Sequence, residues 1–321
     1  MRIVTPITLS NNQSQPTPAN FQQLIQTTIQ YPNGVRFWSP TDGWLYAWLE
    51  NISNGTATIW VKIPSFIPAN GTYQLYMIQD STLPMDGVYW GEAPQLSPTY
   101  GEYDNGNEIF PYYQRFGGLS SLPPNWSSVS GTGLTFASTY IEIEANQTTD
   151  GWYGIYLNPI PSSLASTTTV WEFYGNIYNT AQTNNYAGTM QTSVFNANYG
   201  YTFAGGYNPD IIHFVNANNQ FYSTNYADTN NNKIYTMQMS SATSLQMLVN
   251  YTQIYSTTSA TPVTLSYFQF GTSNGLPNYG IANPIYVYWL RTRAYPPNGV
   301  MPTASFGASQ YSGELITVTV P

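Results

Sequence analysis

Charged residues are scarce in this chain and cysteine is absent. Only 7% of the 321 residues are charged, against about 25% in an average soluble domain. Because there is no cysteine, a disulfide framework, a thiolate nucleophile and a cysteine-ligated zinc site are all excluded. The seven lysines and arginines form no basic run, which argues against nucleic acid as a partner.

Long apolar runs are also missing. No segment approaches the roughly 20 consecutive apolar residues of a transmembrane helix, so we expect no transmembrane segment. The chain begins with Met1-Arg2 and continues directly into a strand-like segment, without the pattern of a signal peptide. We therefore expect either a processed form of an exported protein or a route to the outside without a signal, as virion proteins take.

Neutral hydrogen-bonding residues and aromatic residues take the place of charge. Aromatic residues make up 16% of the chain, and it holds 29 tyrosines. A neutral polar surface keeps its character when carboxylates protonate, and few native ion pairs leave little stability to lose in acid. The composition therefore predicts an acid-stable protein in an acidic, extracellular setting. A sharp loss of stability below about pH 4 would contradict this.

Residues 1–88 are predicted to form a small antiparallel β domain. Short strand-like segments occur at residues 3–9, 35–38, 44–49, 56–63 and 72–78, with polar turns between them and a polar loop at residues 11–20. Side chains alternate between the two faces of a strand. In residues 56–63 this alternation places Trp60 on one face and the apolar set on the other, namely Ala57, Ile59, Val61 and Ile63.

Residues 116–307 are predicted to form a larger antiparallel sandwich. About ten strand-like segments with polar turns, and no amphipathic helix, favour this architecture. Residues 217–232 are rich in asparagine and are predicted to form a loop. The tail, residues 308–321, carries one more strand-like segment, which closes its own sheet or pairs with a neighbouring molecule by strand addition.

A connector block, residues 89–115, joins the two regions. Pro94 and Pro98 argue against a helix or a central strand there. The block is either an ordered connector that buries its aromatic residues or a loop that forms a site. Some of its side chains offer the oxygen ligands that calcium takes, although their spacing differs from that of an EF-hand loop. These calcium candidates are Glu102, Asp104, Asn105 and Glu108.

Several sequence blocks resemble a known family. They include Ala57-Thr-Ile-Trp-Val-Lys-Ile-Pro, Ile67-Pro-Ala-Asn-Gly-Thr, Gly91-Glu-Ala-Pro-Gln-Leu-Ser-Pro and Tyr288-Trp-Leu-Arg-Thr-Arg-Ala-Tyr-Pro-Pro. Together they resemble surface proteins of thermoacidophilic archaea, in which a domain of unknown function precedes a concanavalin-like lectin or glucanase sandwich. The resemblance implies an all-β protein, with a small antiparallel β domain packed on a concanavalin-like, jelly-roll β-sandwich. It implies no catalytic residues.

The chain is rich in acceptor sites for N-linked glycans. Asn-x-Ser/Thr sequons fit a glycosylated exterior, although chance explains several of them in a chain with this composition. Those at predicted turns, Asn12, Asn54 and Asn70, are the preferred candidates. The full set is Asn12, Asn51, Asn54, Asn70, Asn125, Asn146 and Asn250.

Two further groups of residues could form a catalytic or ligand-binding site. Glu142 and Glu144 lie two apart on a predicted strand, and a retaining glycosidase uses two carboxylates about 5 Å apart. The segment lacks the central aspartate and third acid of sandwich glycosidases, so no catalytic residue is assigned. Aromatic rings flanked by amides suit sugars, although many of these rings will fill the core. The loop candidates for ligand binding are Tyr199, Tyr201, Tyr207 and Tyr226.

The sequence therefore predicts a non-enzymatic surface glycoprotein for adhesion or glycan recognition on an archaeal cell envelope or virion. Its expected partners are glycans or envelope glycoproteins, and calcium is the only cofactor considered. The alternative is a structural building block, such as a capsid, turret or filament subunit, that assembles with itself or its neighbours through β-strand contacts. A glycoside hydrolase is the third hypothesis.

Overall fold

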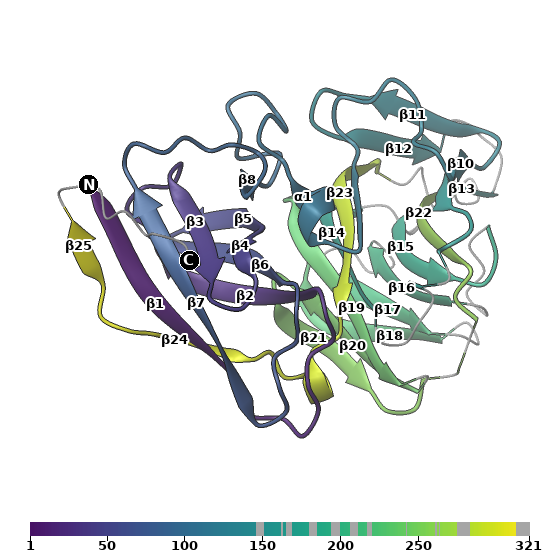
Figure 1. The fold of residues 1–321 in the computed structure, drawn as a ribbon. Helices are drawn as coiled ribbons and strands as arrows, with labels where there is room; N and C mark the ends of the chain where they lie inside the picture. The colour runs from purple at the N-terminus through teal and green to yellow at the C-terminus, as the bar shows by residue number, and fades with distance from the viewer. Residues whose placement is uncertain are drawn as a thin grey trace. The chain divides into compact units, whose positions relative to one another are not determined.

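The fold is known from a computed structural model (Figure 1). It describes residues 1–145, 151–161, 163–164, 169–179, 185–193, 200–205, 211–216, 220–241, 243–260, 262, 264–274 and 283–312. Nearly all regular structure in this part of the chain is β-strand, which confirms the all-β prediction. No helix among the described residues is long and apolar enough to span a membrane. The chain divides into two compact units, Met1–Tyr112 with Pro296–Pro321, and Tyr113–Tyr295.

The first unit is a sandwich of two sheets. In its larger sheet the strands follow the order β24-β1-β7-β3-β4, with β25 also paired to β1. In its smaller sheet the order is β2-β6-β5-β8, and β8 runs parallel to β5. The larger sheet consists of β1 (Arg2–Asn11), β3 (Val35–Ser39), β4 (Gly43–Leu45), β7 (Gly71–Asp80), β24 (Thr303–Phe306) and β25 (Gln310–Ser312). The smaller sheet consists of β2 (Phe21–Thr28), β5 (Ala47–Ser53), β6 (Thr56–Ile63) and β8 (Trp90–Glu92).

Alternating side chains from both sheets form the core of the first unit. The predicted face of β6 is confirmed, because Ala57, Ile59, Val61 and Ile63 are all fully buried in this core. They meet residues of the larger sheet such as Ile7 and Phe37. Each strand therefore directs its other side chains to the outer face of its sheet.

The connector block covers the outer face of the smaller sheet. It contains β8 and a short helix, α1 (Gly106–Ile109). The ring of Phe110, at the end of α1, makes edge contacts with Trp48 and Trp60, with ring centroids 5.3 and 6.3 Å apart. Trp60 is thus buried although it faces away from the core. In this part of the chain the structure shows an ordered segment that buries aromatic side chains.

The second unit is a larger sandwich. One sheet has the order β11-β12-β23-β14-β19-β20-β21, with β9 beside β23, and we call it the front sheet. The other, which we call the back sheet, has the order β10-β13-β22-β15-β16-β17-β18. The front sheet consists of β9 (Tyr112–Arg115), β11 (Thr132–Phe136), β12 (Ile141–Ala145), β14 (Thr169–Asn176), β19 (Lys233–Ser241), β20 (Ser244–Val249), β21 (Thr252–Thr257) and β23 (Ile285–Ala294). The back sheet consists of β10 (Trp126–Ser128), β13 (Gly151–Leu157), β15 (Asn185–Met190), β16 (Gly200–Gly205), β17 (Ile211–Asn216), β18 (Gln220–Ala227) and β22 (Tyr267–Asn274).

Aromatic rings fill the space between these two sheets. Phe173 of β14 stacks on Tyr235 of β19 at 4.6 Å and meets Phe270 of β22 edge-on at 5.1 Å. Phe116 and Trp126 lie in edge contact, with their ring centroids 5.1 Å apart. The described part of this core is therefore built largely from aromatic rings in edge and stacked contacts.

The division into units differs from the predicted one at two places. The connector block belongs to the first unit as far as Tyr112, because β8 pairs with β5 and Phe110 packs on the smaller sheet. The chain also returns to the first unit after Tyr295, because β24 and β25 pair with β1. The strand-like segment expected in residues 313–321 lies outside the described residues.

Candidate functional site

The candidate site lies on the outer face of the front sheet. On β14, Phe173 points into the core, so Glu172 and Tyr174 point outward. On β12 and β23, the core residues Ile141 and Val287 are paired in register, so the residues next to them point outward. Sheet geometry alone thus gathers polar and aromatic side chains from three neighbouring strands on one face.

Four tyrosines on this face form what we call the tyrosine patch: Tyr140, Tyr174, Tyr286 and Tyr288. The ring of Tyr140 lies 5.2 Å from Tyr286 and 5.5 Å from Tyr288, and Tyr288 lies 5.2 Å from Tyr174. All four are half-buried, so each ring keeps an accessible part. The patch is a continuous set of aromatic surfaces rather than isolated side chains.

A β-bulge shapes the patch. Between Tyr174 and Gly175 the register of β14 against β23 shifts, so that Tyr288 has no residue opposite it. An extra residue of this kind re-aims the side chains around it. Trp289 consequently stacks on Tyr174 at 5.7 Å while Tyr288 also reaches that ring. Gly175 is required here, because a Cβ atom would meet the carbonyl oxygen of Tyr286 at 2.4 Å.

Two carboxylates border the patch. Glu142 lies directly opposite Tyr286 in the register of β12 and β23, and Glu144 follows two residues later on the same face. Partial burial and the negative charge of Glu144 raise the pKa of Glu142. Burial and the charge of Glu142 raise the pKa of Tyr286 in turn. The carboxylate and the phenol are therefore close enough to interact at the edge of the patch.

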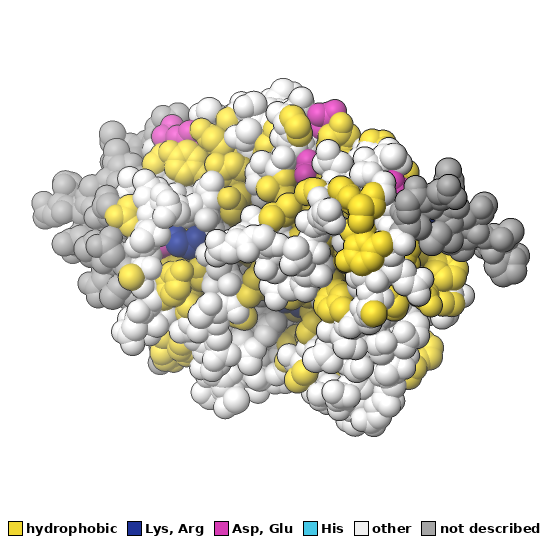
Figure 2. Space-filling model, turned by 90° about the vertical axis from the view of Figure 1, so that its left-hand side faces the viewer, with side chains coloured by type: hydrophobic (Ala, Val, Ile, Leu, Met, Phe, Trp, Pro, Cys, Tyr) yellow, Lys and Arg dark blue, Asp and Glu magenta, His cyan; other side chains and the backbone are white. Residues whose placement is uncertain are grey.

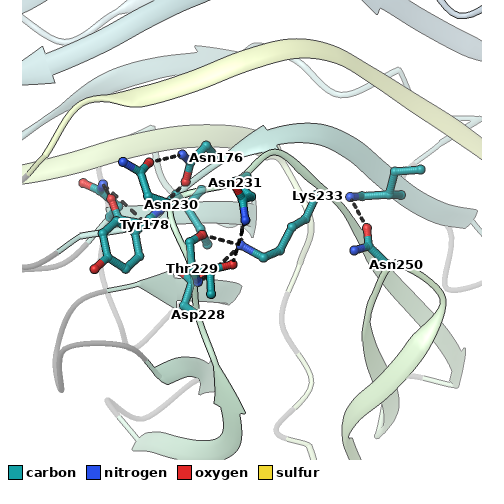
Figure 3. Close-up of polar contacts among 11 residues, drawn as sticks. Asn176, Tyr178, Asp228, Thr229, Asn230, Asn231, Lys233 and Asn250 are labelled. Atoms are coloured by element: carbon teal, nitrogen blue, oxygen red, sulfur yellow. Dashed lines mark hydrogen bonds and ion pairs between the residues drawn. The ribbon is translucent and has the colours of Figure 1, made fainter.

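An asparagine loop, residues 228–233, leads into β19, which pairs with β14 on the side away from β23. Figure 3 shows the polar contacts of this loop. Lys233 reaches back into it, and its ammonium bonds to Asp228 Oδ1 at 2.8 Å and to the carbonyl oxygens of Thr229 and Asn231 at 2.5 and 3.2 Å. Both charged side chains are almost completely buried. Three oxygen atoms converge on one cation, so a side chain fills the position that a bound metal ion takes in other loops.

The loop presents its amides to the tyrosine patch. Asn176, which is paired with Tyr286, donates from Nδ2 to Asn230 Oδ1 at 2.7 Å (Figure 3). A hydrogen bond from Asn232 lowers the pKa of Tyr174, but burial outweighs it and the pKa is raised overall. The site therefore combines aromatic faces, amide groups and a carboxylate pair. These are the groups that bind the C–H faces and hydroxyls of a sugar.

The loop tyrosines predicted as ligand contacts lie elsewhere. Tyr201 is fully buried in strand β16, so it offers no surface to a ligand. Tyr226 is half-buried in β18, and Tyr199 and Tyr207 lie outside the described residues. The prediction of residues 217–232 as a loop was wrong for Gln220–Ala227, because these residues pair with β17. None of the described candidates belongs to the tyrosine patch.

The calcium candidates have structural partners in the first unit. Asp104 accepts hydrogen bonds from Trp48 Nε1 and from the amide of Gly106, both at 3.1 Å. Asn105 donates to the carbonyl oxygen of Val88 at 2.7 Å, Glu102 bonds to Tyr103, and Glu108 is exposed. Within the described ranges no three acidic or histidine side chains converge as metal ligands. The calcium site stays a hypothesis from sequence.

The sequon asparagines that the structure describes all lie at the surface. Asn12, Asn51, Asn54, Asn70, Asn125 and Asn250 have exposed side chains, whereas Asn146 lies outside the described residues. Four of them occupy turns with positive φ, namely Asn54, Asn70, Asn125 and Asn250. Asparagine tolerates this backbone conformation better than most residues. Their positions are compatible with glycosylation, and local backbone geometry also explains the choice of asparagine.

Comparison with known sequences gives partial matches. Residues 31–87 match a domain of unknown function, DUF2341, which confirms the domain of unknown function expected for this part of the chain. Uncharacterized protein 562 of Sulfolobus islandicus rod-shaped virus 1 is 32% identical over 120 residues. The match covers 33% of this chain and 21% of the viral protein, so the chain spans about a fifth of the length of that relative.

Comparison with solved structures gives low overall similarity. The carbohydrate recognition domain of Emp47p aligns with a TM-score of 0.42 and 13% identity, over 57% of this chain and 95% of that chain. A β-glucanase of Bacillus licheniformis aligns with a TM-score of 0.41 and 11% identity, over 57% and 97%. At these scores, function has to be argued from the chain's own residues.

Proposed function

We propose that the tyrosine patch, with the asparagine loop and Glu142, binds a glycan and that the protein is a non-enzymatic recognition protein. The single observation that carries this is the convergence of rings, amides and a carboxylate on one part of a sheet face, where the four tyrosines are half-buried. A sugar ring stacks on an aromatic face through its C–H groups, while its hydroxyls need donors and acceptors at the rim. The patch supplies both kinds of contact.

The setting we propose is the surface of an archaeal cell or of a virion. Few charged side chains, exposed sequon asparagines and the partial match to a protein of an archaeal virus support this. Use of the sequons is tested by the mass of protein purified from its natural source. Glycan masses on Asn12, Asn54 or Asn70 would support an exterior location, and the bare polypeptide mass would contradict it.

Binding is tested with purified full-length protein and immobilised envelope glycans, with free sugar as competitor. We expect saturable, competed binding, and a loss of about tenfold or more in affinity for Tyr286→Ala, because truncated aromatic anchors carry much of a binding energy. Tyr286→Phe keeps the ring and should retain most of the affinity. Tyr311→Ala is the matched control, because Tyr311 is an exposed tyrosine of the first unit. Unchanged binding by Tyr286→Ala would contradict the proposal.

A glycoside hydrolase is the second candidate, favoured by the raised pKa of Glu142 beside Glu144. A raised pKa suits a general acid. Residues two apart on one strand are separated by about 6.7 Å along the backbone. Glutamate side chains from such positions can bring their carboxyl groups to the separation of a retaining enzyme, about 5 Å, or of an inverting enzyme, about 6.5–9.5 Å. Release of reducing ends from a polysaccharide by wild type, abolished in Glu142→Gln, would establish the enzyme. No release by wild type would dismiss it.

A building block of an envelope or particle is the third candidate. The pairing of β24 and β25 with β1 leaves Phe306 and Tyr311 with 41% and 66% of their surface exposed at this side of the larger sheet. Exposed strand edges are ready sites for pairing with another chain. A regular, high copy number in purified envelopes or particles would favour this role. A copy number of only a few per particle would favour the glycan-recognition role over the structural one.

A further inference from the structure

We propose a second glycan-binding site, on the outer face of the larger sheet of the first unit. Its centre is a row of four side chains that we call the tryptophan platform: Trp44, Trp38, Tyr76 and Pro6. It shares no residue with the tyrosine patch, and the argument for it stands without the proposed function of that patch. The ligand class is a neutral polysaccharide.

The row is set by strand register. Trp44 of β4 is paired with Trp38 of β3, Trp38 with Tyr76 of β7, and Tyr76 with Pro6 of β1. The residues beside each of them, such as Phe37, Leu45 and Leu75, lie in the core, so all four platform residues point outward. Four adjacent strands spaced about 4.8 Å apart give a row about 14 Å long. A row of this length accommodates several sugar rings.

The platform is accessible. Trp44 has 47% of its surface exposed, and the other three side chains are half-buried. The rings of Trp38 and Tyr76 lie 5.8 Å apart. Side chains paired directly across antiparallel strands have neighbouring Cβ atoms, so the four form one continuous strip. Contiguous apolar surface rimmed by polar residues is typical of interaction sites on proteins.

The polar tips of the platform distinguish it from the buried aromatic residues of the same unit. The indole N–H groups of Trp48, Trp60 and Trp90 donate to Asp104, Glu50 and the carbonyl of Pro32 at 3.1, 2.8 and 2.7 Å. No described residue provides a comparable partner for the polar tips of Trp38, Trp44 and Tyr76. The platform therefore offers its N–H and O–H groups outward, together with its ring faces.

The neighbouring side chains on this face are polar and uncharged. Thr8 donates from Oγ1 to Gln74 Oε1 at 3.0 Å, and this bond does not use the Nε2 donor of the exposed Gln74. The two arginines of this face are paired, Arg2 with Asp80 at 3.0 Å and Arg36 with Asp86 at 2.9 Å. Figure 2, which views this side of the molecule, shows hydrophobic patches among uncharged polar groups, with few charged side chains.

These features favour a sugar chain over another protein. An apolar partner that covered the platform would bury its N–H and O–H donors without acceptors, at a cost of about 1–3 kcal/mol for each group. A polysaccharide brings hydroxyl acceptors and apolar C–H faces together, so it satisfies both parts of the surface. Because the two described arginines of this face are paired with aspartates, the face favours a neutral sugar chain over an anionic one.

The experiment uses the full-length chain with Tyr286→Ala and Tyr288→Ala, which disable the tyrosine patch. Depletion of this protein by insoluble cellulose, β-1,3-glucan, chitin and mannan measures binding at the remaining site. We expect retention by at least one of them, and affinity lower by about tenfold or more after Trp44→Ala or Trp38→Phe. Phe66→Ala is the matched control, because Phe66 is an exposed aromatic residue of the same unit.

Three results would overturn the proposal. One is that none of the four polysaccharides retains the protein. Another is retention that Trp44→Ala leaves unchanged, because binding would then lie elsewhere. The third is a dimer in sedimentation that Trp44→Ala converts to a monomer, because a second copy of the chain would then cover the platform. Thermal unfolding of each variant checks that the fold is intact, and the exposed position of Trp44 predicts that it is.

Discussion

Glu172 is the centre of a buried ion cluster in the second unit. Its carboxylate accepts hydrogen bonds from Arg291 Nε at 2.8 Å, from Arg293 Nε at 3.0 Å and from Thr236 Oγ1 at 3.1 Å. Glu172 and Arg291 have no exposed surface. Burial by itself would raise the pKa of Glu172, but the charges of Arg293 and Arg291 outweigh it and hold the pKa below its ordinary value. The chain has few charged residues, and this cluster brings three of them together in the interior of the protein.

Glu172→Gln is expected to destabilise the protein by about 3–5 kcal/mol, because it leaves two buried arginines without their counter-charge. Chemical denaturation at neutral pH measures the change in free energy of unfolding. Glu108→Gln is the matched control, since Glu108 is exposed, and it should change stability by less than about 0.5 kcal/mol. A loss below about 1 kcal/mol for Glu172→Gln would show that the cluster contributes little.

The carboxylates also predict how stability depends on pH. Glu172 and Asp80 have lowered pKa values, Asp80 because hydrogen bonds from Thr82 and Arg2 outweigh its burial. Their contributions are present above the ordinary values of 4.5 and 3.8 and are lost only as pH falls through the lowered values. Glu142 and Glu92 have pKa values raised by burial, so their ionised forms cost stability, which is regained as pH falls toward 4.5.

The unfolding temperature should therefore stay level or rise as pH falls from about 7 to about 4.5, and should fall only in stronger acid. Thermal unfolding followed by circular dichroism at steps of about one pH unit measures this. A steady decline between about pH 7 and pH 5 would contradict the expectation. It would also weaken the argument for an acidic setting, which rests on composition alone.

At the scale of elements, the asparagine loop depends on one internal ion pair. Lys233→Met removes the ammonium and leaves the buried carboxylate of Asp228 unpaired, which should cost about 3–5 kcal/mol. The same variant should weaken glycan binding at the tyrosine patch, because Asn230 and Asn232 of the loop contact Asn176 and Tyr174. Denaturation and binding assays on one preparation measure the two effects together.

A double variant separates the effect of the unpaired buried charge from the effect of changing the loop. Asp228→Asn combined with Lys233→Met removes both charges, so it should recover part of the stability lost in Lys233→Met alone. Lys62→Met is the control, because the Lys62 ammonium bonds at the surface of the first unit to the carbonyl oxygen of Glu108. If Lys233→Met binds glycan as wild type does, the loop has no part in the site.

Strands with regular alternation could be predicted from sequence, and irregular ones could not. Strand β6 was predicted at its observed bounds, because its apolar residues alternate without interruption. Strand β2 was missed, because Gln22 and Gln23 break the alternation. Both are buried, with amides that donate to the carbonyl oxygens of Ile109 and Pro302. Those partners are distant in sequence, and local patterns do not contain them.

The residue types of the candidate site were expected from the sequence, but their positions in the fold were not. Tyrosines and asparagines were expected to bind sugars, yet the described tyrosines chosen from loops lie in strands. Glu142 was singled out from its spacing and does border the patch. Tyr140 directly precedes β12, whereas Tyr288 belongs to β23, far away in the chain, and their contact depends on the pairing of β12 with β23. A single sequence gives no information about that pairing.

At the scale of the whole molecule, the two proposed sites make the chain divalent. Two linked sites raise the strength of attachment to a repetitive glycan surface well beyond that of either site. Wild type should therefore cross-link polysaccharide-coated particles, whereas Tyr286→Ala and Trp44→Ala should each bind particles without cross-linking them. Turbidity of a particle suspension measures this. Cross-linking by both single variants would contradict a two-site chain.

The first unit is discontinuous in sequence, and this affects how it folds during translation. Strand β1 leaves the exit tunnel early, but its partners β24 and β25 follow the second unit. The second unit alone, which separates the two segments of the first unit, is roughly 180 residues long, and at about 5–20 residues per second its translation takes about 10–40 s. During that interval the nascent sandwich exposes an unpaired edge, so the cell must keep that edge from other chains until synthesis ends.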